Sequence, residues 1–173
     1  MTTSLVVTAI GSDRPGIVNL LSDVAQRFGA SWAGSRMASL AGQFAGMVHF
    51  EVSDQNAEPL ATALRALEAS GLQVVIAKGE ATAEPVGRRS VRLELVGQDR
   101  PGIIRDLSGR LVQRGVSIEE LHTQVVSGAM SAEHMFKVNA LLAVPAALPN
   151  DELQRVLEAM ANEMMVDIEL EEK

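Results

Sequence analysis

Cysteine is absent from this chain of 173 residues. Its absence excludes disulfides, thiolate metal ligands and a thiol nucleophile. Aromatic residues make up only 3% of the chain, so we expect methionine, leucine and alanine to fill the core. No apolar run reaches the roughly 18 residues that a membrane-spanning helix needs, and the first ten residues lack the basic flank and cleavage site of a secretory signal. We therefore expect a cytoplasmic protein that does not contact a membrane.

Basic residues are outnumbered, with 15 lysines and arginines against 22 aspartates and glutamates, for a net charge of −7. A protein that holds nucleic acid needs a basic face that neutralises phosphates. The densest basic segment is Arg88, Arg89 and Arg92, a pattern that is typical of a solvated linker end. The sequence therefore predicts no direct binding of nucleic acid.

Motifs of catalysis are also absent. The three histidines are His49, His122 and His134, and none has a metal-binding partner at helical spacing. His122 and His134 could approach each other across a hairpin, but no clear carboxylate accompanies them. There is no phosphate-binding loop and no nucleophile elbow. We expect no enzyme activity, no metal and no cofactor.

An internal repeat dominates the sequence. The segment 10–18 recurs 86 positions later as 96–104, and both copies contain Gly-x-Asp-Arg-Pro-Gly-Ile. A second helical pattern, which begins with Leu60, recurs 93 positions later with Leu153. We place the seven additional residues of the second copy near 144–150, where Pro145 and Pro149 indicate an irregular connection. Two copies at so long a period predict duplicated domains.

Each copy has the order β-α-β-β-α-β, which predicts an α+β fold of two ferredoxin-like modules. Each module would be an antiparallel four-stranded sheet with two helices on one face. Pro15 and Pro101 are expected at the first helical position, and Gly29 and Gly115 at the left-handed helix ends. Expected strands lie near 5–10, 32–40, 44–52 and 72–77, and near 91–95, 118–126, 133–142 and 165–170. We assign residues 1–78 to the first module, 79–89 to a linker and 90–173 to the second.

The loop between the first strand and the first helix suits a zwitterion. The first amides of a helix have no intrahelical partners and lie at its positive end, so a carboxylate can dock there. Gly16 and Gly102 let a ligand approach the backbone, while Asp13 and Asp99 can accept hydrogen bonds from an ammonium group. An alternative stays open, in which each aspartate caps the amides of its own helix.

In these residues the chain resembles the ACT domain, and the two-copy chain resembles the family of glycine cleavage system transcriptional repressors. The resemblance implies ligand contacts in the first loop and at the start of the second strand. By position, the ligand-binding residues would be Ser12, Asp13, Gly16, Ile17, Ser31, Trp32, Gln98, Asp99, Gly102, Ile103, Ser117 and Ile118. We expect Ser31 and Ser117 to face the aspartate loops.

The resemblance implies a regulator that binds a small amino acid, such as glycine or serine. It also implies a transcription factor as partner, a LysR-type activator of the glycine cleavage genes, which the regulator contacts directly. Exposed sheet edges favour a homo-oligomer. Two alternatives are a ligand-free dimerisation scaffold and a regulatory module of a metabolic enzyme. Formyltetrahydrofolate hydrolases begin with a similar segment, but a catalytic domain follows it.

Overall fold

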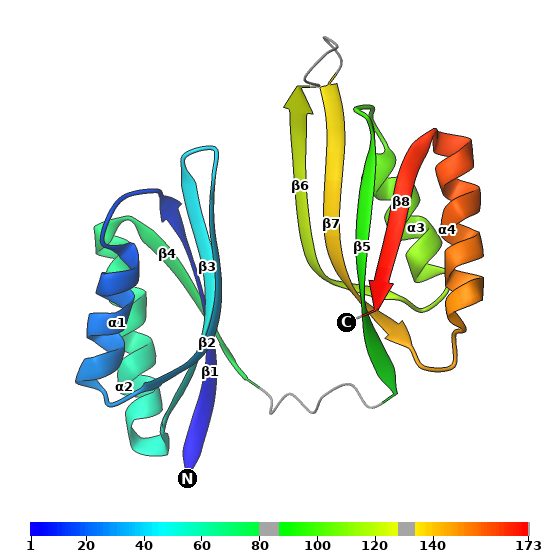
Figure 1. Ribbon diagram of the computed structural model, residues 1–173. Coiled ribbons are helices and arrows are strands. Elements are labelled where there is room, and N and C mark those ends of the chain that lie inside the picture. Colours follow the sequence, from blue (N-terminus) through cyan, green and yellow to red (C-terminus); the bar gives the residue numbers. More distant parts are fainter. Residues whose placement is uncertain (80–86, 128–133, 173) are drawn as a thin grey trace. The chain divides into compact units, whose positions relative to one another are not determined.

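The chain forms two α+β modules in the computed structural model, which describes residues 1–79, 87–127 and 134–172 (Figure 1). The modules belong to two compact units, Met1–Ala83 and Glu84–Lys173. In each module both helices cover one face of a four-stranded sheet, and the other face is open. The predicted fold class and element order are confirmed.

The first module has a sheet of strand order β2-β3-β1-β4, in which every neighbouring pair is antiparallel. Its strands are β1 (Thr2–Ser12), β2 (Ser31–Leu40), β3 (Gln43–Ser53) and β4 (Leu72–Lys78). Its helices are α1 (Ile17–Arg27), α2 (Asp54–Arg65) and a short 3₁₀ helix, η1 (Ala66–Ser70). A two-residue turn joins β2 to β3, and its residues Ala41 and Gly42 both have positive φ, which matches the twist of a hairpin.

The second module repeats this arrangement with strand order β6-β7-β5-β8. Its strands are β5 (Arg88–Gln98), β6 (Ser117–Ser127), β7 (His134–Pro145) and β8 (Val166–Glu172), and its helices are α3 (Ile103–Val112) and α4 (Asn150–Met164). Arg88 and Arg89, which the sequence analysis assigns to the linker, are the first residues of β5 because they pair with the end of β7. Residues 80–86 of that linker lie outside the described residues.

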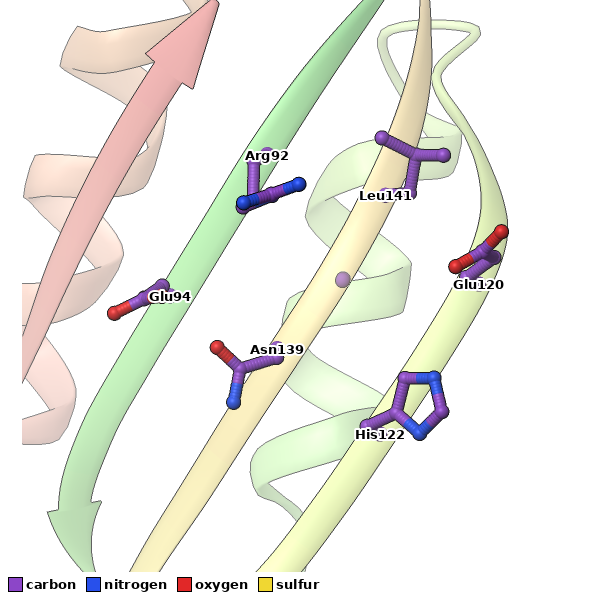
Figure 2. A pocket seen from close by; sticks show the side chains of 7 residues that line it. Arg92, Glu94, Glu120, His122, Asn139 and Leu141 are labelled. Atoms are coloured by element: carbon purple, nitrogen blue, oxygen red, sulfur yellow. The ribbon is translucent and has the colours of Figure 1, made fainter. Parts of the chain in front are cut away.

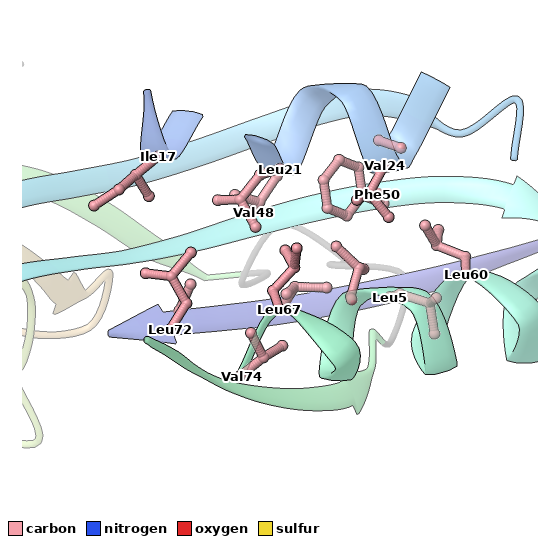
Figure 3. Close-up of a cluster of buried hydrophobic side chains, with 14 of the residues drawn as sticks. Leu5, Ile17, Leu21, Val24, Val48, Phe50, Leu60, Leu67, Leu72 and Val74 are labelled. Atoms are coloured by element: carbon pink, nitrogen blue, oxygen red, sulfur yellow. The ribbon is translucent and has the colours of Figure 1, made fainter. Parts of the chain in front are cut away.

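Each core lies between the helices and the covered face of the sheet. Ile17, Leu21 and Val24 recur on one side of α1, and each is at most 3% exposed. They meet Leu5 and Phe50 from the central strands (Figure 3). This spacing of apolar residues on α1 makes one helix stripe apolar, so the sequence pattern explains which side of the helix packs. None of the described helices is long and apolar enough to cross a bilayer.

The ladder registers correct the predicted position of the additional residues in the second copy. Ser31 and Ser117 are equivalent and lie 86 positions apart, whereas their partners Glu51 and Ala143 lie 92 positions apart. Six of the seven additional residues therefore belong to the connection between β6 and β7, and only one to the connection before α4. The connection between the expected strands 118–126 and 133–142 falls mainly in residues 128–133, outside the described residues.

Candidate functional site

The turn before each first helix is built by a Pro-Gly pair. Gly16 has φ 94° and ψ −2°, and Gly102 has φ 97° and ψ −7°. These angles are those of the third residue of a type II turn, where proline favours the preceding position. Pro15 therefore lies in the turn and not at the first helical position, and the prediction for both prolines was wrong. Glycine is required because a left-handed φ strains any residue that has a Cβ.

The helix starts present unpaired backbone amides. The first helical bond of α1 joins the Leu20 amide to the Gly16 carbonyl, at 2.9 Å. The free amides of α1 are consequently those of Ile17, Val18 and Asn19. Among the described residues no side chain caps α1 or α3, and around Gly16 a Cβ would meet no atom within 4 Å. The amides at this helix start are therefore approachable.

Asp13 and Asp99 hold equivalent places beside these helix starts. Their backbone amides donate to the Gly42 and His134 carbonyls respectively, each at 2.9 Å. Both side chains are exposed, and within the described ranges neither carboxylate accepts a hydrogen bond. The alternative in which each aspartate caps its own helix is wrong. Both carboxylates remain available to a ligand.

The two arginines of the repeated loop differ in their contacts. Arg14 donates from Nη2 to the Ser70 carbonyl at 2.5 Å. This bond ties the first loop to the end of η1. Arg100 makes no hydrogen bond or ion pair within the part of the chain that the structure describes. The loop of the first module is thus held by one more contact than the loop of the second.

The residues expected at the start of the second strand do not lie at the aspartate loop. Ser31 pairs with Glu51, which pairs with Ser4, whereas Asp13 follows Ser12 at the other end of β1. Eight residues of strand separate Ser4 from Ser12, which is about 26 Å. The expectation that the strand-two serines face the aspartate loops is therefore wrong within one module.

Their side chains also have structural contacts. Trp32 packs edge-on against Phe50, with ring centroids 5.2 Å apart and planes at 88°. Ile118 packs against the second core. The Ser117 hydroxyl accepts a hydrogen bond from Arg88 at 3.1 Å, and the same guanidinium nitrogen donates to two backbone carbonyls. These contacts fix the start of β2 and β6.

Ile17 and Ile103 are also among the predicted ligand-binding residues, but their side chains are buried. Their side chains are 3% and 2% exposed and belong to the two cores. Each can offer a ligand only its backbone amide. Ser12 and Gln98, by contrast, end β1 and β5 with exposed side chains. In each module, the structure therefore brings together only those predicted ligand-binding residues that belong to the loop between the first strand and the first helix.

The histidines do not form a joint site. His122 pairs with Asn139, while His134 pairs with Ser127, so the two rings lie five ladder positions apart and on opposite faces of the sheet. His49 is hydrogen-bonded to the Ser4 hydroxyl at 2.6 Å. Within residues 1–79, 87–127 and 134–172, no three histidine or acidic side chains gather as metal ligands would.

Sequence reasoning missed a polar hollow on the open face of the second sheet. Its side chains rise from three neighbouring strands, as Figure 2 shows. The lining residues are Arg92, Glu94, Glu120, His122, Asn139, Ala140 and Leu141. Alternation of charged and buried residues in β5 is the sequence signal for this face. The hollow does not include the Asp99 loop, so it is separate from the helix start.

Comparison with known proteins identifies the modules. The ACT domain profile matches residues 3–77 and again residues 91–171. Over 164 residues the chain is 27% identical to the glycine cleavage system transcriptional repressor of Escherichia coli (strain K12), which covers 92% of this chain and 85% of the repressor. The protein of the same name from Shigella flexneri matches with the same identity and coverage.

Two solved structures agree with this result over nearly the whole chain. One is described only as an unknown protein from Galdieria sulphuraria; it has a TM-score of 0.89 and 30% identity, and covers 100% of this chain and 99% of its own. The other, provisionally named a glycine cleavage system transcriptional repressor, has a TM-score of 0.71 at 22% identity, with coverage of 99% and 97%. The second likeness concerns the fold alone. From the two profile matches and the repeated βαββαβ architecture, the chain belongs to the ACT domain family and carries two ACT domains in tandem.

Proposed function

We propose that this chain is an amino-acid-responsive regulatory protein, with its ligand site at the start of the first helix of one or both modules. The observation that carries the proposal is the pairing, in both copies, of unpaired helix amides with an exposed aspartate. A ligand carboxylate would accept bonds from the amides, where the helix dipole favours negative charge. The ligand ammonium would donate to Asp13 or Asp99.

A small amino acid, with glycine or serine first among the candidates, suits this site. The contacts offered by the loop are backbone amides and one carboxylate, which recognise the α-amino-acid group that every amino acid has. The side chains of Ile17 and Ile103 point into the cores and offer nothing to a ligand side chain. Selectivity for a small ligand would therefore rest on the room around the loop.

Residues at the start of β2, such as Ser31, could contact the ligand only if it is bound at the aspartate loop of a second copy of the chain. β2 is an edge strand, with one row of backbone groups unpaired within its sheet. If two β2 strands pair in antiparallel fashion, the start of one lies beside the end of the other. Ser31 of one copy would then lie toward the aspartate loop of the other, and the chain would act as a homo-oligomer.

The names of the similar proteins support a proposal for the downstream action. A protein from Escherichia coli that is similar along most of this chain is named a transcriptional repressor of the glycine cleavage system. We place this chain in the same role, as a cytoplasmic regulator that contacts a transcription factor of one-carbon metabolism, a LysR-type activator. Its net charge of −7 suits action through a protein rather than through DNA. Co-purification of such an activator with and without amino acid tests this step.

The ligand site is tested by titration calorimetry with glycine, serine and larger amino acids. Acetate and methylamine serve as probes that carry only one of the two charged groups. We expect Asp13→Asn or Asp99→Asn to weaken binding at its own module about 10- to 100-fold, since a hydrogen bond to a charged group contributes about 1.5–3 kcal/mol. Asp151→Asn is the matched control, because Asp151 is an exposed carboxylate at the start of α4, which follows the end of β7 that pairs with Arg88, whereas Asp99 follows the other end of β5.

Two results would contradict the proposal. Unchanged affinity in the Asp13→Asn, Asp99→Asn double variant would remove the aspartates from the site. An absence of heat with every amino acid, in a protein that still binds its partner, would favour the ligand-free scaffold. Association with a metabolic enzyme instead of a transcription factor would favour the regulatory module of an enzyme.

A further inference from the structure

The open face of the first sheet carries a cluster of exposed apolar side chains. Large hydrophobic side chains on this face are well exposed, at 43% for Ile10, 51% for Met47, 68% for Val75 and 80% for Leu40. The ladder partners place these side chains on the same face, in adjoining rows. We call this surface the apolar face; its apolar residues are Val6, Ile10, Ala38, Leu40, Ala45, Met47, Val75 and Ala77, and the polar residues Thr8, Arg36, Gln43, His49 and Gln73 lie among them. An exposed apolar patch of this extent is characteristic of an interaction site.

The equivalent face of the second sheet is charged. Val6 pairs with Ala77 in the first sheet, and at the same ladder position of the second sheet Arg92 pairs with Glu171. Likewise, Val75 corresponds to Glu169. Gln124 replaces Ala38, Lys137 replaces Ala45 and Asn139 replaces Met47, whereas Ile10 and Leu40 have the apolar counterparts Val96 and Val126. The ACT fold therefore does not need apolar residues at six of the eight positions, and those of the first module require another reason.

The arrangement of charge on the apolar face permits two copies to meet. Arg36 belongs to the middle row of the face, beside Met47, and β2 carries it at one edge of the sheet. Val75 lies in the same row at the opposite edge, on β4. A twofold axis parallel to the strands would place β2 of one copy over β4 of the other. Each Arg36 would then cover a Val75 with its aliphatic stem, and the two guanidinium groups would stay at opposite edges.

The open face of the first sheet as a whole, polar ends included, is large enough for a specific dimer. Four strands at about 4.8 Å spacing and about nine residues at 3.3 Å give about 570 Å² on each copy. Two copies would bury about 1,100 Å², which exceeds the roughly 1,000 Å² expected of a biological interface. Two sheets stack face to face at about 10 Å, with their strands nearly aligned.

We propose that the apolar face packs against the same face of a second copy of this chain, which forms a twofold-symmetric dimer through the first modules. The charged face of the second module has no part in this contact, because carboxylates would oppose carboxylates there. The contact is independent of amino-acid binding, since the aspartate loops lie at the end of the sheet and not on its face.

Sedimentation over a range of concentrations tests the dimer in the full-length protein. We expect wild-type protein to associate, and Val75→Glu to weaken the association at least 100-fold, because the new carboxylate would be buried without a partner. Met47→Asn should weaken it about 10-fold. Met47 belongs to the central strand β3, so this variant leaves both sheet edges unchanged. Both substitutions copy the residue at the equivalent ladder position of the second module.

Val112→Glu is the matched control, because Val112 is 69% exposed on α3, a helix of the second module and not part of any sheet. It should associate as the wild type does, and circular dichroism checks that each variant folds. Wild-type protein that stays at the mass of one 18.4-kDa chain at about 100 μM would overturn the proposal. So would dimers of Val75→Glu and Met47→Asn that are as tight as the wild-type dimer, since the interface would then lie elsewhere.

Discussion

The two modules share a backbone plan but differ in what surrounds it. Both have a left-handed glycine before the first helix, with φ 94° at Gly16 and 97° at Gly102. Among the described residues, only the first loop is tied to its neighbour by an arginine, through Arg14 and Ser70, and the open face of the first sheet is the more apolar of the two. The second sheet instead presents Arg92 and charged neighbours on that face.

This contrast separates what the fold requires from what each copy does with it. The glycine before the helix is common to both copies because the turn cannot form easily without it. The open face is free to vary, since no helix covers it and the core lies on the other side. Features that differ between the copies are therefore the better guide to the separate tasks of the modules.

The largest expected effect tests whether the two cores are independent. Phe50 is fully buried, and Phe50→Ala should destabilise the first module by about 3–5 kcal/mol through lost contacts and a cavity. Leu142 is at the equivalent ladder position of the second module and is also fully buried. Leu142→Ala should destabilise the second module by about 2–5 kcal/mol. Hydrogen exchange by mass spectrometry should show protection lost only in the altered module. Equal loss in both modules would mean that they unfold as one unit.

A smaller effect tests the feature that the modules share. Gly16→Ala and Gly102→Ala should each cost roughly 1–2 kcal/mol, because alanine disfavours the left-handed conformation, and the space around both positions is open. Urea titrations measure the cost. Gly109→Ala is the control, since Gly109 lies inside α3 with open space around it and no positive φ; this variant should gain stability, by up to about 1 kcal/mol. Equal behaviour of all three variants would disprove the backbone explanation.

The smallest effect concerns the arginines, where the modules differ. Arg14→Ala removes an exposed hydrogen bond to the Ser70 carbonyl and should lower stability by a few tenths of a kcal/mol, in line with other surface contacts. Arg100→Ala should leave stability unchanged within error. Thermal unfolding of the two variants beside the wild type measures the difference. A larger loss for Arg100→Ala would reverse the comparison of the two loops.

Much of the fold could be predicted because the sequence pattern of each strand and helix occurs twice in the chain. Strand alternation, the apolar stripe from Ile17 to Val24, and the glycines at the helix ends all describe local geometry. The start of the first helix was misplaced because Pro-Gly is compatible with both a type II turn and a first helical turn. Only the angles at Gly16 decide between the two.

The candidate site was harder to predict because it depends on sheet order. The sequence indicates both the aspartate loop and the start of β2, but not the ladder that places them about 26 Å apart. The histidine pair failed for the same reason, since a hairpin register fixes which residues oppose each other. The apolar face, by contrast, has a visible signal: β1 is apolar at Val6 and Ile10, whereas β5 has Arg92 at the place equivalent to Val6.

The edge-on packing of Trp32 against Phe50 has a practical consequence. The chain has one tryptophan and no tyrosine, and that tryptophan belongs to the first module. Indole emission therefore reports unfolding of the first module alone, while far-ultraviolet dichroism reports both. Two optical signals from unlabelled protein can separate the stabilities of the modules without cutting the chain.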